Sequence, residues 1–191
     1  MRDLSVNSAG YIGGSLSDHT NYEKKISRST PHEVKNLMIT HNYYGDIWFN
    51  FNFDGETVGL DCALAANVTD ALIAWLESIC LGYKETLFVI DEEGPLKMLR
   101  FYSDFNKPSR FTVLSTYHRK KHTKRSTVIC DILTDKRDFV KKFYKKIQSA
   151  LKKTPDGIYE DMNAKAPVRK SAIIENFLKD KASKIKTSCR L

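Results

Sequence analysis

The sequence has few cysteines, and none of them stands in a metal-binding or redox pattern. Its 191 residues include four, Cys62, Cys80, Cys130 and Cys189, and no two form a Cys-x-x-Cys pair. This spacing argues against a zinc ribbon and against a thioredoxin-type site. Cys62 and Cys130 fall on apolar faces of predicted strands, where a reduced thiol packs like a small hydrophobic side chain. We therefore expect reduced thiols in a cytoplasmic protein.

Long apolar segments are also missing. Charged residues interrupt every apolar stretch well short of the roughly 18–20 residues that a membrane-spanning helix needs. The first seven residues, which include Arg2 and Asp3, do not form the apolar core of a secretory signal. The sequence therefore predicts neither a membrane span nor secretion.

No catalytic or cofactor signature is present. Gly10, Gly13 and Gly14 lie close together, but no strand pattern precedes them and no Gly-Lys-Ser/Thr follows, so a phosphate-binding loop is not indicated. There is no Gly-x-Ser-x-Gly motif, and the five histidines are scattered. Cys80 is the one thiol near a predicted helix end, and no neighbour in the sequence would lower its pKa. We expect no catalytic residue, no cofactor and no metal site, which favours a protein that is not an enzyme.

The composition supports one folded domain with appendages. Hydrophobic residues make up 41% of the chain and aromatic residues 11%, which is enough to fill a core. Residues 1–29 are rich in Ser, Asn and Gly and predict a flexible leader. Residues 30–153 carry the periodic segments of an α+β core domain. Residues 154–191 predict a basic C-terminal helix and tail.

The segment 47–62 predicts a β-hairpin. Residues Ile47 to Phe53 alternate apolar and polar, and Asp54-Gly55 is a favoured dipeptide for a two-residue type I′ turn. A turn there pairs residue 53 with 56, 51 with 58, 49 with 60 and 47 with 62. Beyond the tip these pairs place apolar side chains together on one face, so the turn and the pattern indicate the same register.

Four helices are predicted from capping signals and apolar periodicity. The first begins at Thr30-Pro31-His32-Glu33 and has Val34, Leu37 and Met38 on its apolar side. The second begins after Asn67 and ends near Gly82. The third is capped by Asp135, with Asp138 three residues later, and runs to about residue 153. The last spans about residues 168–181.

Four further strands are predicted at 87–90, 96–102, 110–117 and 127–133. Their connections are short, so successive strands should be antiparallel neighbours. The core order is then strand-strand-helix-strand-strand-strand-strand-helix. We expect an α+β fold in which helices cover one antiparallel sheet of about six strands.

The charge is divided unevenly along the chain. Residues 1–117 contain 10 Lys or Arg and 15 Asp or Glu, a balance of −5, whereas residues 118–191 contain 21 and 8, a balance of +13. Such a split indicates that the C-terminal half faces a polyanion, without saying which one.

Two groups of residues could make that contact. A predicted hairpin tip has five Lys or Arg in seven positions, and like charges crowded in a tight tip repel one another without a counter-charge. The lysines on the polar side of the third helix could extend this basic surface. The candidate partner-binding residues are Arg119, Lys120, Lys121, Lys124, Arg125, Lys141, Lys142, Lys145 and Lys146. The alternative is that both groups are solvated and serve solubility.

An acidic cluster and two aromatic residues are further candidates. Asp91, Glu92 and Glu93 follow a predicted strand, and such carboxylates could bind a divalent metal in a nuclease. A nuclease would require a basic residue at the neighbouring strand position, and the sequence has none there. The alternative hypothesis is that the cluster forms a polar turn. Trp48 and Tyr102 could stack on bases if exposed, although both lie in alternating strands.

Part of the chain resembles a pattern in small, mostly uncharacterised bacterial proteins, some of which are similar to immunity proteins of toxin systems. The pattern consists of Trp75-Leu76-Glu77-Ser78-Ile79-x-x-Gly82 followed by residues 88–95, and the likeness extends from Trp48 to Phe101. The resemblance implies a non-enzymatic bacterial protein that binds something, and it carries over no site residue.

These features lead to one functional expectation and two alternatives. We expect a non-enzymatic intracellular binding protein whose basic C-terminal half engages nucleic acid or an acidic protein surface, with nucleic acid favoured. The first alternative is an immunity-type inhibitor of a bacterial toxin or another acidic partner. The second is a metal-dependent nuclease that uses Asp91, Glu92 or Glu93.

Overall fold

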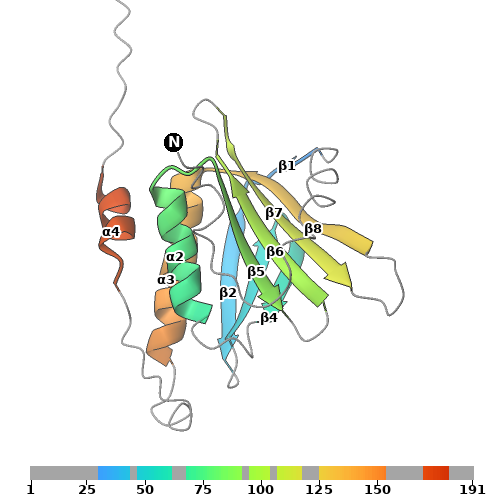
Figure 1. Cartoon of the computed structure of the whole chain (residues 1–191), viewed down its shortest axis with the longest axis horizontal. Coiled ribbons are helices and arrows are strands. Elements are labelled where there is room, and N and C mark those ends of the chain that lie inside the picture. The colour runs from blue at the N-terminus through green and yellow to red at the C-terminus, as the bar shows by residue number, and fades with distance from the viewer. Residues whose placement is uncertain are drawn as a thin grey trace, which may run out of the picture.

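The computed structural model describes residues 30–43, 47–61, 68–91, 95–103, 107–117, 125–153 and 170–180. These residues form strands and helices that are arranged as an α+β fold, which confirms the predicted class (Figure 1). The elements are β1 (His32–Glu33), β2 (Leu37–Tyr43), β3 (Ile47–Phe53), β4 (Glu56–Asp61), α2 (Val68–Cys80), β5 (Glu85–Asp91), β6 (Pro95–Tyr102), β7 (Ser109–Tyr117), β8 (Arg125–Thr134), α3 (Lys136–Lys153) and α4 (Ala172–Lys179).

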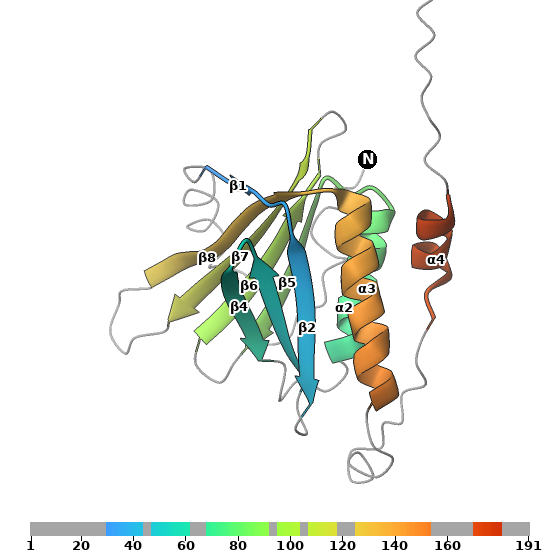
Figure 2. The ribbon, with the colours of Figure 1, turned by 180° about the vertical axis from the view of Figure 1, so that it is seen from behind.

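The strands form two sheets, so the prediction of one antiparallel sheet of about six strands is only partly confirmed. A five-stranded sheet has the order β1-β8-β7-β6-β5, and a three-stranded sheet has the order β2-β3-β4. β1 runs parallel to β8, with His32 beside Ile132, which makes the larger sheet mixed. The smaller sheet lies behind the larger one in Figure 1 and in front of it in Figure 2. Hairpin pairing is local, whereas the joining of distant hairpins depends on tertiary packing.

The helix predicted from Thr30 is wrong, because this segment forms β1 and β2. In β2, Leu37 and Ile39 are buried while Met38 is 60% exposed, which is the two-residue period of a strand. β2 pairs along its whole length with the edge of β3. A capping pattern such as Thr30-Pro31-x-Glu33 only permits a helix, and the hydrogen bonds that β3 offers decide against it.

The β3–β4 hairpin confirms the predicted turn and register. Phe53 lies opposite Glu56, Phe51 opposite Val58 and Phe49 opposite Leu60. The turn residues Asp54 and Gly55 have φ angles of 48° and 96°, both positive, as a type I′ turn requires. Cys62, the predicted partner of residue 47, lies outside the described residues. The turn also contacts the residues that lead into β2. The Asp54 carboxylate accepts hydrogen bonds from the backbone N–H groups of Lys35 and Asn36, at 3.5 and 3.4 Å.

Replacing Gly55 by Val is expected to lower the free energy of unfolding by about 1 kcal/mol or more, because a β-branched residue resists a positive φ. The φ of 96° lies well outside the range such residues adopt, while the space around the missing Cβ is open. Urea unfolding would measure the loss. The control is Glu56→Val, which adds the same side chain at an exposed strand position. Equal, small effects of the two variants would mean that the turn is not stabilised by Gly55.

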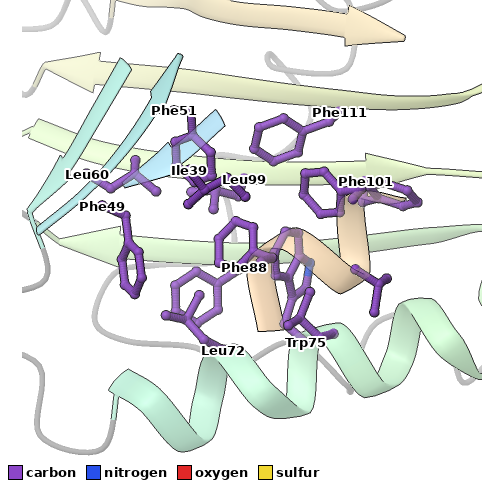
Figure 3. Packing of buried hydrophobic residues seen from close by; sticks show 14 of the residues in the cluster. Ile39, Phe49, Phe51, Leu60, Leu72, Trp75, Phe88, Leu99, Phe101 and Phe111 are labelled. Atoms are coloured by element: carbon purple, nitrogen blue, oxygen red, sulfur yellow. The ribbon is translucent and has the colours of Figure 1, made fainter. Parts of the chain in front are cut away.

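Aromatic side chains from both sheets and two helices share one core (Figure 3). Trp75 of α2 and Phe143 of α3 are fully buried, with ring centroids 5.6 Å apart. Phe143 also contacts Phe51 of the small sheet at 5.2 Å, and Phe51 contacts Phe111 of the large sheet at 5.6 Å. Contacts at these distances bind the layers together, so α2 and α3 are fixed on the core side of the large sheet.

The C-terminal helix α4 packs against α2 and α3 (Figures 1 and 2). Its residue Ile174 is fully buried in the common core. Ser171 caps the helix by accepting a hydrogen bond from the Ile174 backbone at 3.1 Å, and the Ser171 backbone donates to the Tyr144 hydroxyl at 3.0 Å. The predicted helix is confirmed with tighter bounds than 168–181, and it packs against both α2 and α3.

Candidate functional site

The lysine-bearing helix α3 is held in a fixed orientation. Asp135 caps its first turn, because the Asp138 backbone donates to the Asp135 carboxylate at 2.7 Å, as predicted. One side of the helix is buried and consists of Phe139, Val140, Phe143, Tyr144, Ile147 and Ala150. Its sequence contains eight Lys or Arg and one Asp in 18 residues. Among the basic residues of α3 whose side chains are described, none lies on this buried side.

The four predicted lysines of α3 differ in exposure and in ion pairing. Lys141 and Lys145 are exposed, and Lys142 and Lys146 are half-buried. Lys142 is paired with Asp138, one helical turn earlier, at 2.8 Å. The ion pairs among the described residues leave the other three unneutralised. Repulsion between like charges four residues apart destabilises a helix slightly, so an anionic partner would relieve it.

Two basic residues at the start of α3 serve the fold instead. The Arg137 guanidinium donates to the backbone carbonyls of Leu178 and Asp180 at the C-terminal end of α4. These carbonyls carry the partial negative charge of the helix end, which a cation stabilises. The Lys136 ammonium lies 5.6 Å from the centre of the Phe177 ring, and burial lowers its pKa. The available charge of α3 therefore begins at Lys141.

The basic loop is only flanked by the described residues. Outside the described residues lie Arg119, Lys120, Lys121, His122 and Lys124. The backbone of Arg125 is the first position of β8. β7 and β8 pair antiparallel as far as Tyr117 and Arg125, which confirms that residues 118–124 connect a hairpin. β8 runs from this end to the start of α3 (Figure 1). Ten strand residues span about 33 Å. The start of β8 at Arg125 and the start of α3 therefore lie at opposite ends of this strand.

The acidic candidates remain a prediction. Asp91 ends β5, while Glu92 and Glu93 lie outside the described residues. No group of three or more His, Cys, Asp or Glu within the described ranges could hold a metal ion. Lys97, which lies near the acidic cluster in the sequence, donates to the Gly59 carbonyl at 2.6 Å and so joins the two sheets.

The described thiols are poor nucleophiles. Burial raises the pKa of Cys80 to about 12, with nearby Lys136 opposing and Glu77 adding to the shift. Burial also raises the pKa of Cys130, which is fully enclosed on the core face of β8, as its predicted packing role requires. A thiol that is protonated at neutral pH neither attacks nor binds a metal readily. Burial therefore favours the protonated form of the Cys80 thiol.

Tyr102 does not present a free stacking surface, since it is half-buried and the Lys84 ammonium lies 5.6 Å from its ring centre. The side chain of Trp48 lies outside the described set. Sequence reasoning missed the internal roles of Lys97, Lys136 and Arg137, because each depends on a partner at least 38 residues away.

None of the helices in the described ranges is long and apolar enough to cross a membrane. Comparisons with protein-family models, curated proteins and solved structures find no match for this chain.

Proposed function

We propose that this chain is a non-enzymatic binding protein whose basic C-terminal half engages a polyanionic partner, with nucleic acid favoured. The observation that carries the proposal is a set of lysines on the outer side of α3 that no ion pair among the described residues neutralises. The other side of this helix packs into an aromatic core. Such lysines are held at fixed spacing. Their ordering cost on binding is therefore limited to the side chains themselves.

The spacing of these charges suits an extended anion. Lys141, Lys145 and Lys152 are exposed, and at about 1.5 Å per residue they span roughly 16 Å along the helix axis. Lys146 adds a charge on the flank. A phosphate backbone offers negative charge along such a length, and each neutralised phosphate releases condensed counterions.

The loop residues Arg119, Lys120, Lys121, Lys124 and Arg125 are proposed as a second contact. A partner that touches both this loop and α3 has to span the length of β8, whose ten residues separate Arg125 from the start of α3, which favours a long polymer over a small anion. The same charges would also serve an inhibitor of the immunity type with an acidic partner protein. That alternative predicts a complex that survives nuclease treatment of a native lysate, whereas a nucleic-acid complex would be lost.

The helix contact is expected to appear in the salt dependence of binding. The helix variant carries three substitutions, Lys141→Gln, Lys145→Gln and Lys146→Gln. For a nucleic-acid duplex or single strand, the slope of the logarithm of its binding constant against the logarithm of the salt concentration should flatten by about 2–3 units. Each lost phosphate contact takes roughly 0.7–0.9 from that slope. Gln keeps helix propensity close to that of Lys, so the fold should persist. Fluorescence anisotropy at several salt concentrations would measure the slopes.

A matched control removes three exposed lysines from the other half of the chain: Lys35→Gln, Lys84→Gln, Lys107→Gln. Its slope should stay close to that of the wild type. Neutralising the five loop residues should flatten the slope by up to about four units, more than the helix variant, if the loop is the main contact. Absence of salt-dependent binding of the wild type to DNA, RNA or an acidic protein would refute the proposal.

A further inference from the structure

The edges of the two sheets differ in how well they could accept another strand. β1 is only two residues long, and β2 lies beside α3 (Figures 1 and 2). On β4, the Gly59 carbonyl accepts a hydrogen bond from the Lys97 ammonium at 2.6 Å. A short strand, a neighbouring helix and a lysine at the edge each hinder the addition of a strand. The remaining edge, β5, is seven residues long and contains neither lysine nor proline.

The backbone of β5 is paired on one side. Its one strand partner among the described residues is β6, and their register continues without a bulge. The Ser103 N–H donates to the Lys84 carbonyl at 2.8 Å. Because the bonding direction alternates along an antiparallel ladder, the even-numbered residues of β5 bond to β6. The odd-numbered residues direct their N–H and C=O groups away from β6, and no hydrogen bond among the described residues uses these groups: Glu85, Leu87, Val89 and Asp91.

The contact of α2 with β5 leaves this edge open. α2 packs on the core face of the strand, where the ring centroids of Trp75 and Phe88 lie 6.1 Å apart. On the opposite face, Leu87 is half-buried and packs against the small cluster that contains Val89. Both contacts involve the faces of the strand, whereas a new strand would bond in the plane of the sheet. An apolar edge with a row of unpaired backbone groups is a template for another strand.

We propose that β5 is a dimer interface, at which β5 of a second copy of this chain pairs antiparallel and joins the two five-stranded sheets. The interface is isologous, with a two-fold axis at Phe88. All seven residues then pair, each with a residue of the other copy: Glu85 with Asp91, Thr86 with Ile90, Leu87 with Val89, and Phe88 with itself. Each pair of odd-numbered residues exchanges two hydrogen bonds.

The strand is complementary to itself in this register. Leu87 of each copy lies opposite Val89 of the other, so the apolar cluster on that face continues across the interface. Only the end pairs bring two acidic residues together, Glu85 and Asp91. The Arg100 guanidinium lies 2.6 Å from the Glu85 carboxylate and supplies a counter-charge there. Registers centred on Leu87 or Val89 pair fewer residues and place an acidic residue opposite an apolar one, which selects the register centred on residue 88.

Amide hydrogen exchange of the full chain tests the pairing residue by residue. The N–H groups of Leu87 and Val89 should exchange rapidly in dilute protein and at least roughly tenfold more slowly at concentrations where the dimer forms. The N–H of Phe88 bonds to β6 and should be protected at both concentrations. Sedimentation velocity over the same range measures the dimer itself. Nuclease treatment beforehand removes any nucleic acid that bridges two copies through their basic residues.

A pair of variants at one position separates the backbone contact from the side chain. Leu87→Pro removes an N–H that the ladder with β6 does not use, which is a position where edge strands tolerate proline. It should weaken dimerisation by at least roughly tenfold, because the ring also blocks the approaching strand. Leu87→Ala shortens the same side chain but keeps the N–H, and it should weaken dimerisation by only roughly threefold.

Four outcomes would overturn the proposal. The first is a chain that stays monomeric at every concentration measured. The second is a dimer in which the amides of Leu87 and Val89 still exchange rapidly, since another surface would then join the copies. The third is protection of these amides that does not change with protein concentration, since another strand would then occupy the edge. The fourth is a folded Leu87→Pro variant that dimerises like the wild type. If this variant does not fold, the exchange measurement on the wild type decides.

Discussion

Phe143→Ala is expected to lower the free energy of unfolding by about 3–5 kcal/mol, the usual range for removing a buried phenylalanine. Phe143 is 0% exposed, and its ring lies within 5.8 Å of the ring centres of Phe49, Phe51, Trp75 and Phe139. These neighbours come from the small sheet and from both core helices, so the site cannot collapse by moving a single element. The loss should include both the transfer of the ring and the cavity left behind.

Phe143→Leu is a milder substitution at the same position and serves as the comparison. Leu retains most of the volume and all of the apolar character, and the expected loss is about 1.5 kcal/mol or less. Urea unfolding followed by far-UV circular dichroism would measure both, with similar slopes against denaturant if the transition stays two-state. Losses below about 1 kcal/mol for both variants would contradict the central position of Phe143.

Arg110→Met is expected to lower the free energy of unfolding by about 3 kcal/mol at neutral pH. The Arg110 guanidinium makes two hydrogen bonds to the Asp131 carboxylate, at 2.8 and 2.6 Å. The Asp131 side chain is only 6% exposed, so removing its cation leaves a buried charge without its ion-pair partner. Breaking such a pair on one side is strongly destabilising, because the desolvation of the remaining charge is no longer offset.

The double variant Arg110→Met, Asp131→Leu distinguishes this explanation from lost packing. Replacing both members of a buried ion pair by apolar groups is often close to neutral, so the double variant should recover most of the stability lost in the single one. Thermal and urea unfolding of the four proteins of the cycle give the coupling energy between the two side chains. A double variant as unstable as the sum of the two single variants would show that the pair does not act as a unit.

β8 lies between the two basic groups along the chain, which matters for how the proposed function is tested. The sequence treats residues 119–125 and 141–146 as neighbours along the chain, and a common surface is the natural expectation. β8 runs between them and carries the hairpin end away from α3. Binding experiments that neutralise only one group therefore report on that group alone. Comparing the two sets of variants shows whether a partner spans both.

The internal use of Lys136 and Arg137 changes which residues are worth testing. Both lie in the same basic helix as Lys141 and Lys145, and nothing in the sequence sets them apart. Their contacts with α4 contribute to the stability of the fold. If they were substituted, a loss of binding could not be distinguished from a loss of packing. The choice of Lys141, Lys145 and Lys146 for the helix variant avoids this ambiguity.

The sequence by itself determined the elements whose signals are local. The β3–β4 hairpin follows from Asp54-Gly55 and an alternation that agrees with the turn, so its register needs no distant partner. The start of α3 follows from Asp135, and the end of α2 near Gly82, where the chain takes a positive φ of 87°, follows from glycine. In these places backbone geometry and side-chain pattern favour the same structure within a few residues.

Only the tertiary structure decided how those elements combine. β2 is a strand because the edge of β3 supplies its hydrogen bonds, although a capping pattern at Thr30 permits a helix. The division into two sheets and the docking of α4 through Arg137 and Tyr144 both depend on contacts between residues far apart in the chain. The free energies that select among such arrangements come from packing and pairing, which a local pattern does not encode.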